Sequence, residues 1–243
     1  MSTQRRRASR GATAPTTPTT PAAPARPGNA RDRILAVAYS LFCRHGIQAV
    51  GIDTIIATSG VAKMTVYRHF RSKDDLVLAV LERREELWTH RWLEAEVRRR
   101  ATDPTEQLLA IFDVFDDWFH KRTFEGCLFI NVLLEFDRRH PLHRASRQHL
   151  AHIRTLVAAL ASDAGINDAD AFASEWHILM KGSIVAAAEG DTDAARRAHT
   201  LGELLLDDAT KSSERRSSRA VSARQPHRPT RPSNQRAPTA IER

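Results

Sequence analysis

The chain has 243 residues and a formal net charge of +8, a length that suits one or two domains with a substantial core. Its two cysteines, Cys43 and Cys127, lie far apart in the sequence, which excludes a disulfide framework or a zinc-finger spacing and indicates two free thiols. The basic N-terminus has no apolar run of signal-peptide type, and no apolar stretch approaches the ~18 residues of a membrane span. We therefore expect a cytoplasmic protein that makes no use of the membrane.

The positive charge is concentrated in three places. Residues 1–30 hold five arginines and no acid, and residues 211–243 hold nine basic and two acidic residues. Between these ends, residues 31–73 carry seven basic and two acidic side chains, whereas residues 74–210 carry sixteen and twenty-five. A small basic module thus precedes an acidic body, as expected when one end of a molecule meets phosphates.

The first ordered element is expected near Asn29. Residues 1–28 are rich in Arg, Thr, Ala and Pro, with prolines at every third position from Pro15 to Pro27; this pattern predicts an extended, disordered arm and excludes a helix. Asn29 can cap a helix. The apolar residues that follow at helical spacing, before Gly46, are Ile34, Leu35, Ala38, Leu41 and Phe42.

Two short helices follow, one between Gly51 and Gly60 and one from about Lys63 to Phe70. Short helices joined by a tight turn that contains glycine are typical of a helix-turn-helix. In the second helix, Val66 and Phe70 are four apart and predict the buried side. The polar and basic side chains left outward suit a DNA groove, with the helix start placed to meet bases or phosphates and a methionine able to touch a thymine methyl: Lys63, Met64, Thr65, Tyr67, Arg68 and His69.

The rest of the chain predicts only helices. Ser72 and Asp75 form a capping-box pattern, and a long helix continues from Leu76 towards Arg100. Further apolar helical faces follow Pro104 and end near residue 210, and no alternating segment indicates a sheet. We therefore predict an all-α protein of about nine helices, with a disordered basic tail over residues 211–243.

The acidic body has two candidate interaction surfaces. An aromatic excess suggests a ligand cavity with polar anchors, although an ordinary core explains the same pattern; the candidates are Phe112, Phe115, Trp118, Phe119, Phe129, Asn131, Glu135, Trp176 and His177. Gly182, Ala186 and Gly190 recur every four residues and predict a smooth helix face. With the final helix, which holds Leu201 and Leu205, this face suits either a dimeric four-helix bundle or packing within one chain.

Enzyme signatures are absent from the sequence. It has no glycine-rich phosphate loop and no nucleophile elbow. Its eleven histidines do not fall into metal-ligand spacing; His149 and His152 fall on one helix face, where solvated side chains are the simpler interpretation. We therefore expect no catalytic residues, no cofactor and no metal.

The stretch from Arg33 to Leu76 resembles the DNA-binding domain of TetR-family transcriptional regulators. The residues that carry the resemblance are Arg33-Ile34-Leu35, Ala38, Leu41-Phe42, Gly46, Ile52, Ile55, Ser59-Gly60-Val61, Thr65, Tyr67, His69-Phe70, Ser72-Lys73 and Leu76. Where the family often has Ser or Thr as a helix cap, this chain has Ala62. The resemblance implies phosphate contacts by Thr65, Tyr67 and His69, with Lys73 as a further clamp at the start of the next helix.

The resemblance implies a helix-turn-helix domain over residues 29–88, with the motif at about 51–70, and a helical ligand-binding and dimerisation domain over residues 89–210. The leading interpretation is a homodimer that binds double-stranded DNA at a palindromic operator and acts as a repressor released by a small-molecule effector. The alternative is a helical small-molecule-binding protein or enzyme whose DNA module is vestigial.

Overall fold

The computed structural model describes residues 29–223, and all regular structure in that range is helical. The helices are α1 (Ala30–His45), α2 (Ile52–Ser59), α3 (Lys63–His69), α4 (Lys73–Arg84), η1 (Glu85–Leu93), α5 (Glu94–Arg100), α6 (Pro104–Phe119), α7 (Leu128–Glu135), α8 (Pro141–Asp163), α9 (Ala169–Glu189) and α10 (Ala194–Ala223). Because α4, η1 and α5 follow one another without a break, residues 73–100 form one helix and the described chain has nine. This confirms the expected all-α fold.

The helix ends lie where local chemistry places them. Asn29 Oδ1 accepts a hydrogen bond from the Asp32 N–H at 3.0 Å, and Ser72 Oγ accepts one from the Asp75 N–H at 3.0 Å. Each of these bonds satisfies a donor that the first turn of a helix leaves free. Gly60 ends α2 with φ of 63°, a left-handed conformation that side chains with a Cβ rarely adopt.

The final helix is longer than the sequence pattern predicted. We expected disorder from residue 211, but α10 continues to Ala223, so the prediction is wrong for residues 211–223. Neither proline nor glycine occurs between residues 211 and 225, and nothing in the local sequence therefore ends the helix. The expected arm, 1–28, and the rest of the expected tail, 224–243, lie outside the described residues.

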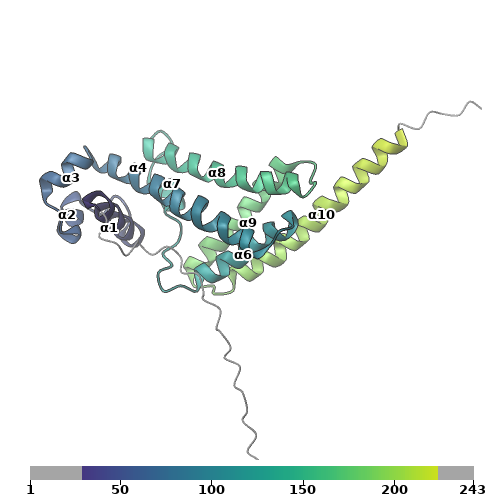
Figure 1. Ribbon diagram of the computed structural model, residues 1–243, viewed down its shortest axis with the longest axis horizontal. Helices are drawn as coiled ribbons and strands as arrows, with labels where there is room; N and C mark the ends of the chain where they lie inside the picture. The colour runs from purple at the N-terminus through teal and green to yellow at the C-terminus, as the bar shows by residue number, and fades with distance from the viewer. Residues whose placement is uncertain (1–28, 224–243) are drawn as a thin grey trace, which may run out of the picture.

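The helices form a small head and a larger body. Figure 1 shows α1, α2 and α3 gathered at one end of the molecule, with α4 leading from them towards the body. In the body, α8 packs against α7 and α9, and α10 packs against α6 and α9. The later part of α10 leaves the body at the end away from the head (Figure 1). Within residues 29–223, no helix has both the length and the hydropathy of a membrane span.

The helix that joins head and body changes its winding between Glu85 and Leu93, where the backbone has the wider π form. Trp88, Trp92 and Leu93 of this segment are all buried, between 0% and 7% exposed. Segments of π-helix are rare and often occur at functional sites. The π segment is therefore the part of the connecting helix that buries two tryptophans and a leucine.

Helix α10 approaches the body core closely at one glycine. A Cβ added at Gly202 would lie 2.8 Å from Trp176 Cη2 and 3.1 Å from Phe112 Cε2. Trp176 and Phe112 are both fully buried, and their rings pack with centroids 5.1 Å apart. The absence of a side chain at Gly202 therefore allows α10 to lie against two large aromatic rings.

We predict that Gly202→Ala lowers the free energy of unfolding by about 1–3 kcal/mol, because the added methyl overpacks a filled core. Urea unfolding followed by circular dichroism measures the change. The same substitution in a Trp176→Phe background should cost clearly less, because the smaller ring vacates the contacted position. Equal losses in the two backgrounds would show that the methyl does not meet Trp176.

Candidate nucleic-acid interface and adjoining cavity

Helix α3 lies at the outer end of the head (Figure 1), and most of its side chains are exposed to solvent. Val66 and Phe70 are 0% and 4% exposed and fix the helix to the head, as predicted. Met64 is 79% exposed and Tyr67 is 41% exposed. Of the remaining predicted DNA contacts, the structure places four on α3 and one at the start of α4: Lys63, Thr65, Arg68, His69 and Lys73.

The start of α3 has no side-chain cap. Ala62 occupies the capping position and makes no side-chain hydrogen bond, and its carbonyl accepts the Thr65 N–H at 2.8 Å. Lys63 Nζ lies 3.4 Å from Asp53 Oδ1 on α2, and both side chains are largely exposed. Such an exposed ion pair is weak, so a phosphate can take the place of the aspartate at little cost.

Lys73 links the start of α4 to the turn between α1 and α2. Its Nζ donates a hydrogen bond to the Gln48 carbonyl at 3.3 Å, and its side chain is partly buried. The ammonium group is therefore held at the surface of the head rather than free to sample many positions. This arrangement suits a cation that meets a phosphate at a fixed place.

The same turn is held from the body by Glu135, the last residue of α7. Glu135 Oε2 accepts the Ile47 N–H at 2.9 Å, and Oε1 accepts the Gln48 N–H. The Gln48 side-chain amide in turn donates to the Glu135 carbonyl at 2.7 Å. Glu135 does not line the cavity described below. The residue expected as a ligand anchor connects the body to the head through these contacts.

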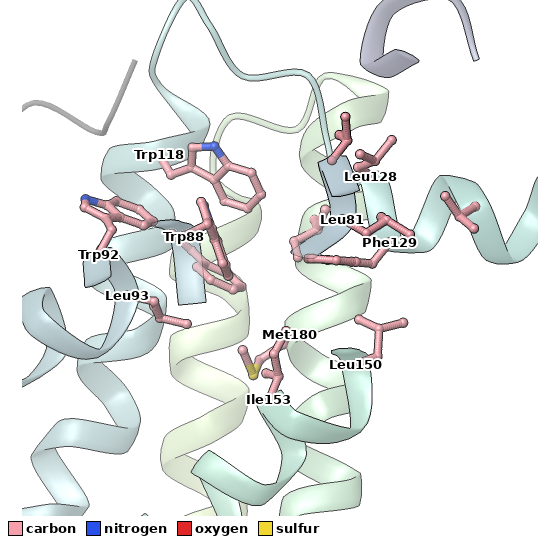
Figure 2. Close-up of a cluster of buried hydrophobic side chains, with 14 of the residues drawn as sticks. Leu81, Trp88, Trp92, Leu93, Trp118, Leu128, Phe129, Leu150, Ile153 and Met180 are labelled. Atoms are coloured by element: carbon pink, nitrogen blue, oxygen red, sulfur yellow. The ribbon is translucent and has the colours of Figure 1, made fainter. Parts of the chain in front are cut away.

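A narrow cavity lies inside the body, where the long helix, α6, α7, α8 and α9 meet. Figure 2 shows part of its wall, with Trp88 and Trp118 facing Phe129, Met180 and Ile153. The residues that line it are Arg84, Trp88, Phe115, Trp118, Cys127, Leu128, Phe129, Ile130, Leu150, Ile153, His177, Met180, Lys181 and Ile184. Its free volume is about 20 Å³, which holds about one water molecule.

Only part of the predicted pocket set lines this cavity. Phe115, Trp118, Phe129 and His177 do so. The others lie elsewhere: Phe112 and Trp176 pack on each other, Phe119 packs against the rings of Phe115 and Trp118 without lining the cavity, and Asn131 is half-buried outside the cavity wall. Sequence reasoning missed Arg84, Trp88, Met180 and Lys181, because the side of each helix that lines the cavity depends on which other helices pack against it.

The cavity wall contains the buried imidazole of His177 and two cationic side chains, Arg84 and Lys181. His177 is 3% exposed, and its Nδ1 has no hydrogen-bond partner among the described residues. Burial, reinforced by the positive charges of Lys181 and Arg154, lowers the pKa of His177 to about 3. The imidazole is therefore neutral at physiological pH, and its unpartnered nitrogen can bond to a ligand.

Arg84 joins the cavity to the head. Its guanidinium lies 5.4 Å from the centroid of the Trp88 ring, which faces the cavity, and 5.0 Å from that of Tyr39, which belongs to α1. Trp88 also packs on Trp118, with centroids 5.0 Å apart. A path of contacts therefore runs from the Trp88 ring to α1 through the stacked guanidinium. Glu135 supplies a second route, because α7 also carries Leu128 and Phe129 of the cavity wall.

Helices α9 and α10 expose an apolar face. Among the residues predicted for a dimer, Gly182 is exposed, with no atom within 4 Å of an added Cβ, and Leu201 is 51% exposed. Ala186 and Leu205 are half-buried, and Gly190 caps the end of α9. The large exposed apolar side chains beside them are Ile178, Val185 and Leu204. An apolar face of this kind on two neighbouring helices marks a candidate interface.

Comparison with known proteins identifies the family. Residues 34–80 match the model for bacterial regulatory proteins of the tetR family, and residues 104–201 match the model for tetracyclin repressor-like C-terminal domains. The crystal structure of a TetR-family transcriptional regulator from Streptomyces coelicolor is 32% identical; the match covers 74% of this chain and 95% of that one, with a TM-score of 0.67. The chain belongs to the TetR family.

Two curated relatives show similarity over shorter stretches. The transcriptional regulator QacR of Staphylococcus aureus is 33% identical over 70 residues, which are 29% of this chain and 37% of QacR. The transcriptional activator FasR of Mycolicibacterium smegmatis is 36% identical over 91 residues, which are 36% of this chain and 39% of FasR. The chain thus spans less than two fifths of the length of either TetR-type relative.

We predict that stability in acid depends on His177. Its pKa is about 3 in the folded chain and about 6.5 when exposed, so the unfolded chain binds the proton more readily. Stability from the neutral imidazole is complete above about pH 6.5 and is lost as the pH falls towards 3. In His177→Gln the unfolding free energy should therefore fall less steeply between about pH 6.5 and 4.5. Urea unfolding at several pH values measures this, and the exposed variant His90→Gln should follow the wild type.

We predict that Glu135→Gln loosens the turn between α1 and α2. The neutral side chain offers one acceptor where two amides now bind, which leaves an N–H group unsatisfied or bound to water. The Ile47 and Gln48 amides should exchange with deuterium faster, by about fivefold or more for a lost interaction of ~1 kcal/mol. Glu125→Gln is the matched control, since that carboxylate lies 3.5 Å from the Arg44 side chain. Unchanged exchange in Glu135→Gln would contradict the assigned contact.

Proposed function

We propose that the protein is a homodimeric transcriptional regulator that binds a palindromic operator through α3 and leaves it when a small molecule occupies the body cavity, and so acts as a repressor. The observation that carries the proposal is the exposed face of α3, in the basic segment 31–73 that precedes the acidic body 74–210, in a member of a family of regulatory proteins. This combination suits sequence-specific binding of DNA.

The DNA contacts divide by position on the head. Lys63 and Met64 open α3 and are placed for base edges in the major groove. Thr65, Tyr67 and His69, with Lys73 at the start of α4, are placed for phosphates and fix the orientation of the helix. Because α3 has only seven residues, one copy reads few base pairs, and two copies on two half-sites give useful specificity.

The dimer would form across the exposed faces of α9 and α10. Ile178 and Leu204 are each 64% exposed, and Gly182 leaves the α9 surface smooth between larger side chains. Burial of this apolar face against a second copy favours association. A two-fold axis through a bundle of four such helices sets the separation of the two α3 helices.

In its present state the cavity is too small for an effector, so the binding of an effector would have to change the structure around it. Ligand pockets commonly have 300–1,000 Å³, whereas this one has about 20 Å³, so an effector must displace the aromatic wall. Trp88 belongs to the helix that carries Lys73, and Arg84 connects its ring to α1. Occupancy would therefore move the head and alter the separation of the two α3 helices. This requires the effector to bind one arrangement better than the other.

The chemistry of the wall defines the class of effector. Trp88, Trp118 and Phe129 offer aromatic and apolar contact, and neutral His177 beside Lys181 offers a hydrogen bond and a positive charge. A flat apolar molecule with one acceptor or anionic group matches this set.

The DNA-binding proposal is tested with Lys73→Ala and Tyr67→Ala. Selection of bound fragments from genomic DNA should return a discrete palindromic site for the wild type, and both variants should bind it more weakly. The slope of log affinity against log salt concentration should fall by about 1 for Lys73→Ala, which removes a cation from a phosphate, and should stay nearly unchanged for Tyr67→Ala, which removes a neutral contact. Lys211→Ala, on α10, is the control for removal of a lysine. A wild type that selects no discrete site would sink the proposal and favour the alternative of a vestigial DNA module.

A further inference from the structure

Three side chains that commonly bind metals meet where the connecting helix packs on α8. His149 and His152 lie one turn apart on α8, and Glu85 is the first residue of the π segment η1. One ligand atom from each of the three lies within 4.8 Å of the other two. The sequence showed the histidine pair but not its partner, because Glu85 precedes His152 by 67 positions.

Each oxygen of the Glu85 carboxylate faces a different imidazole. Oε1 lies 2.5 Å from His152 Nδ1, and Oε2 lies against His149 Nδ1. The second contact lacks the direction of a hydrogen bond, so His149 Nδ1 is a buried nitrogen with no hydrogen-bond partner in the described part of the chain. The cluster therefore holds two imidazole nitrogens and both oxygens of one carboxylate, and one of the nitrogens makes no hydrogen bond within the described chain.

The burial of the three groups suits a site with access from one side. The side chains of Glu85 and His149 are 12% and 11% exposed, whereas that of His152 is 48% exposed. Glu85 and His149 are thus shielded from water, whereas His152 lies at the solvent-exposed edge of the cluster. The ring of His149 is further held against Phe129, with centroids 5.2 Å apart, which limits its rotation.

We infer that Glu85, His149 and His152 bind one divalent transition-metal ion of the Zn²⁺ type. Imidazole nitrogen and carboxylate oxygen are ordinary Zn²⁺ ligands at about 2.0–2.2 Å, and three protein ligands leave a fourth position for water or another ligand. Two nitrogen donors argue against Mg²⁺ and Ca²⁺, which prefer oxygen. Binding requires each imidazole to offer an unprotonated nitrogen and small movements that separate the ligand atoms to about 3.3 Å, the spacing around a tetrahedral ion.

A bound ion ties the π segment to α8 at the residue where the winding changes. Glu85 follows Arg84, which lines the cavity, and His149 packs on Phe129 of the cavity wall. The ion therefore braces one side of the cavity and the helix that leads to the head, and this role does not depend on whether the protein binds DNA.

The experiment uses the full chain without a histidine tag, freed of metal with EDTA and then titrated with Zn²⁺ against a chromogenic chelator. We expect one tight site per chain, and Co²⁺ in its place should give the absorption of a four-coordinate ion. His152→Ala and Glu85→Gln should each weaken binding by about 100-fold or more, since even loss of a ligand's supporting contact costs 10–100-fold. Zn²⁺ should also raise the thermal unfolding midpoint of the wild type but not of these variants.

His90→Ala is the matched control, because His90 is 49% exposed and pairs with Glu94 at 2.8 Å but belongs to no cluster of three metal-binding side chains among residues 29–223. It should bind Zn²⁺ as the wild type does. Circular dichroism confirms that every variant is folded. A wild type that binds no Zn²⁺ at about micromolar concentration, or a His152→Ala variant that binds as tightly as His90→Ala, would overturn the inference. DNA binding is not part of the readout, so the result is independent of the proposed function.

Discussion

The structure depends on one unbroken helix, residues 73–100, that belongs to the head and the body at once. Its first residue, Lys73, holds the turn between α1 and α2, and Trp88, further along, forms part of the cavity wall. A head joined in this way cannot move freely as a domain on a flexible linker does. Its position is fixed by the packing of the helix against the body and by the contacts of Arg84 and Glu135.

The aromatic side chains give this connection its stiffness. Trp88 contacts Trp92, Phe115 and Trp118, and their mutual packing leaves room for little more than a water molecule. Close-packed interiors respond to an added group by shifting whole elements rather than by local compression. In the proposed regulation, the small size of the cavity would therefore couple its contents to the head, and the polar groups His177 and Lys181 would decide which molecules gain from opening it.

The features that could be predicted from the sequence are those that depend on residues close together in the chain. The caps at Asn29 and Ser72, the buried positions Val66 and Phe70, and the helix-turn-helix follow from residues within a few positions of each other. The roles of Glu135 and Glu85 could not be predicted, because each depends on a contact with a segment more than sixty residues away. The pocket was predicted only in part for the same reason. Aromatic residues on one helix face are equally suited to a core and to a cavity wall, and only the packing of other helices distinguishes the two.

The π winding of residues 85–93 has a geometrical consequence for the head. In α winding each residue turns the helix by about 100°, and the wider π turn advances by less. The number of residues that keep π hydrogen bonds therefore sets the angle between the cavity-facing side of the helix and its start at Lys73. The direction in which α3 faces therefore depends on the winding of the connecting helix between residues 85 and 93. A gain or loss of a single π turn would rotate the head about that axis without bending any hinge.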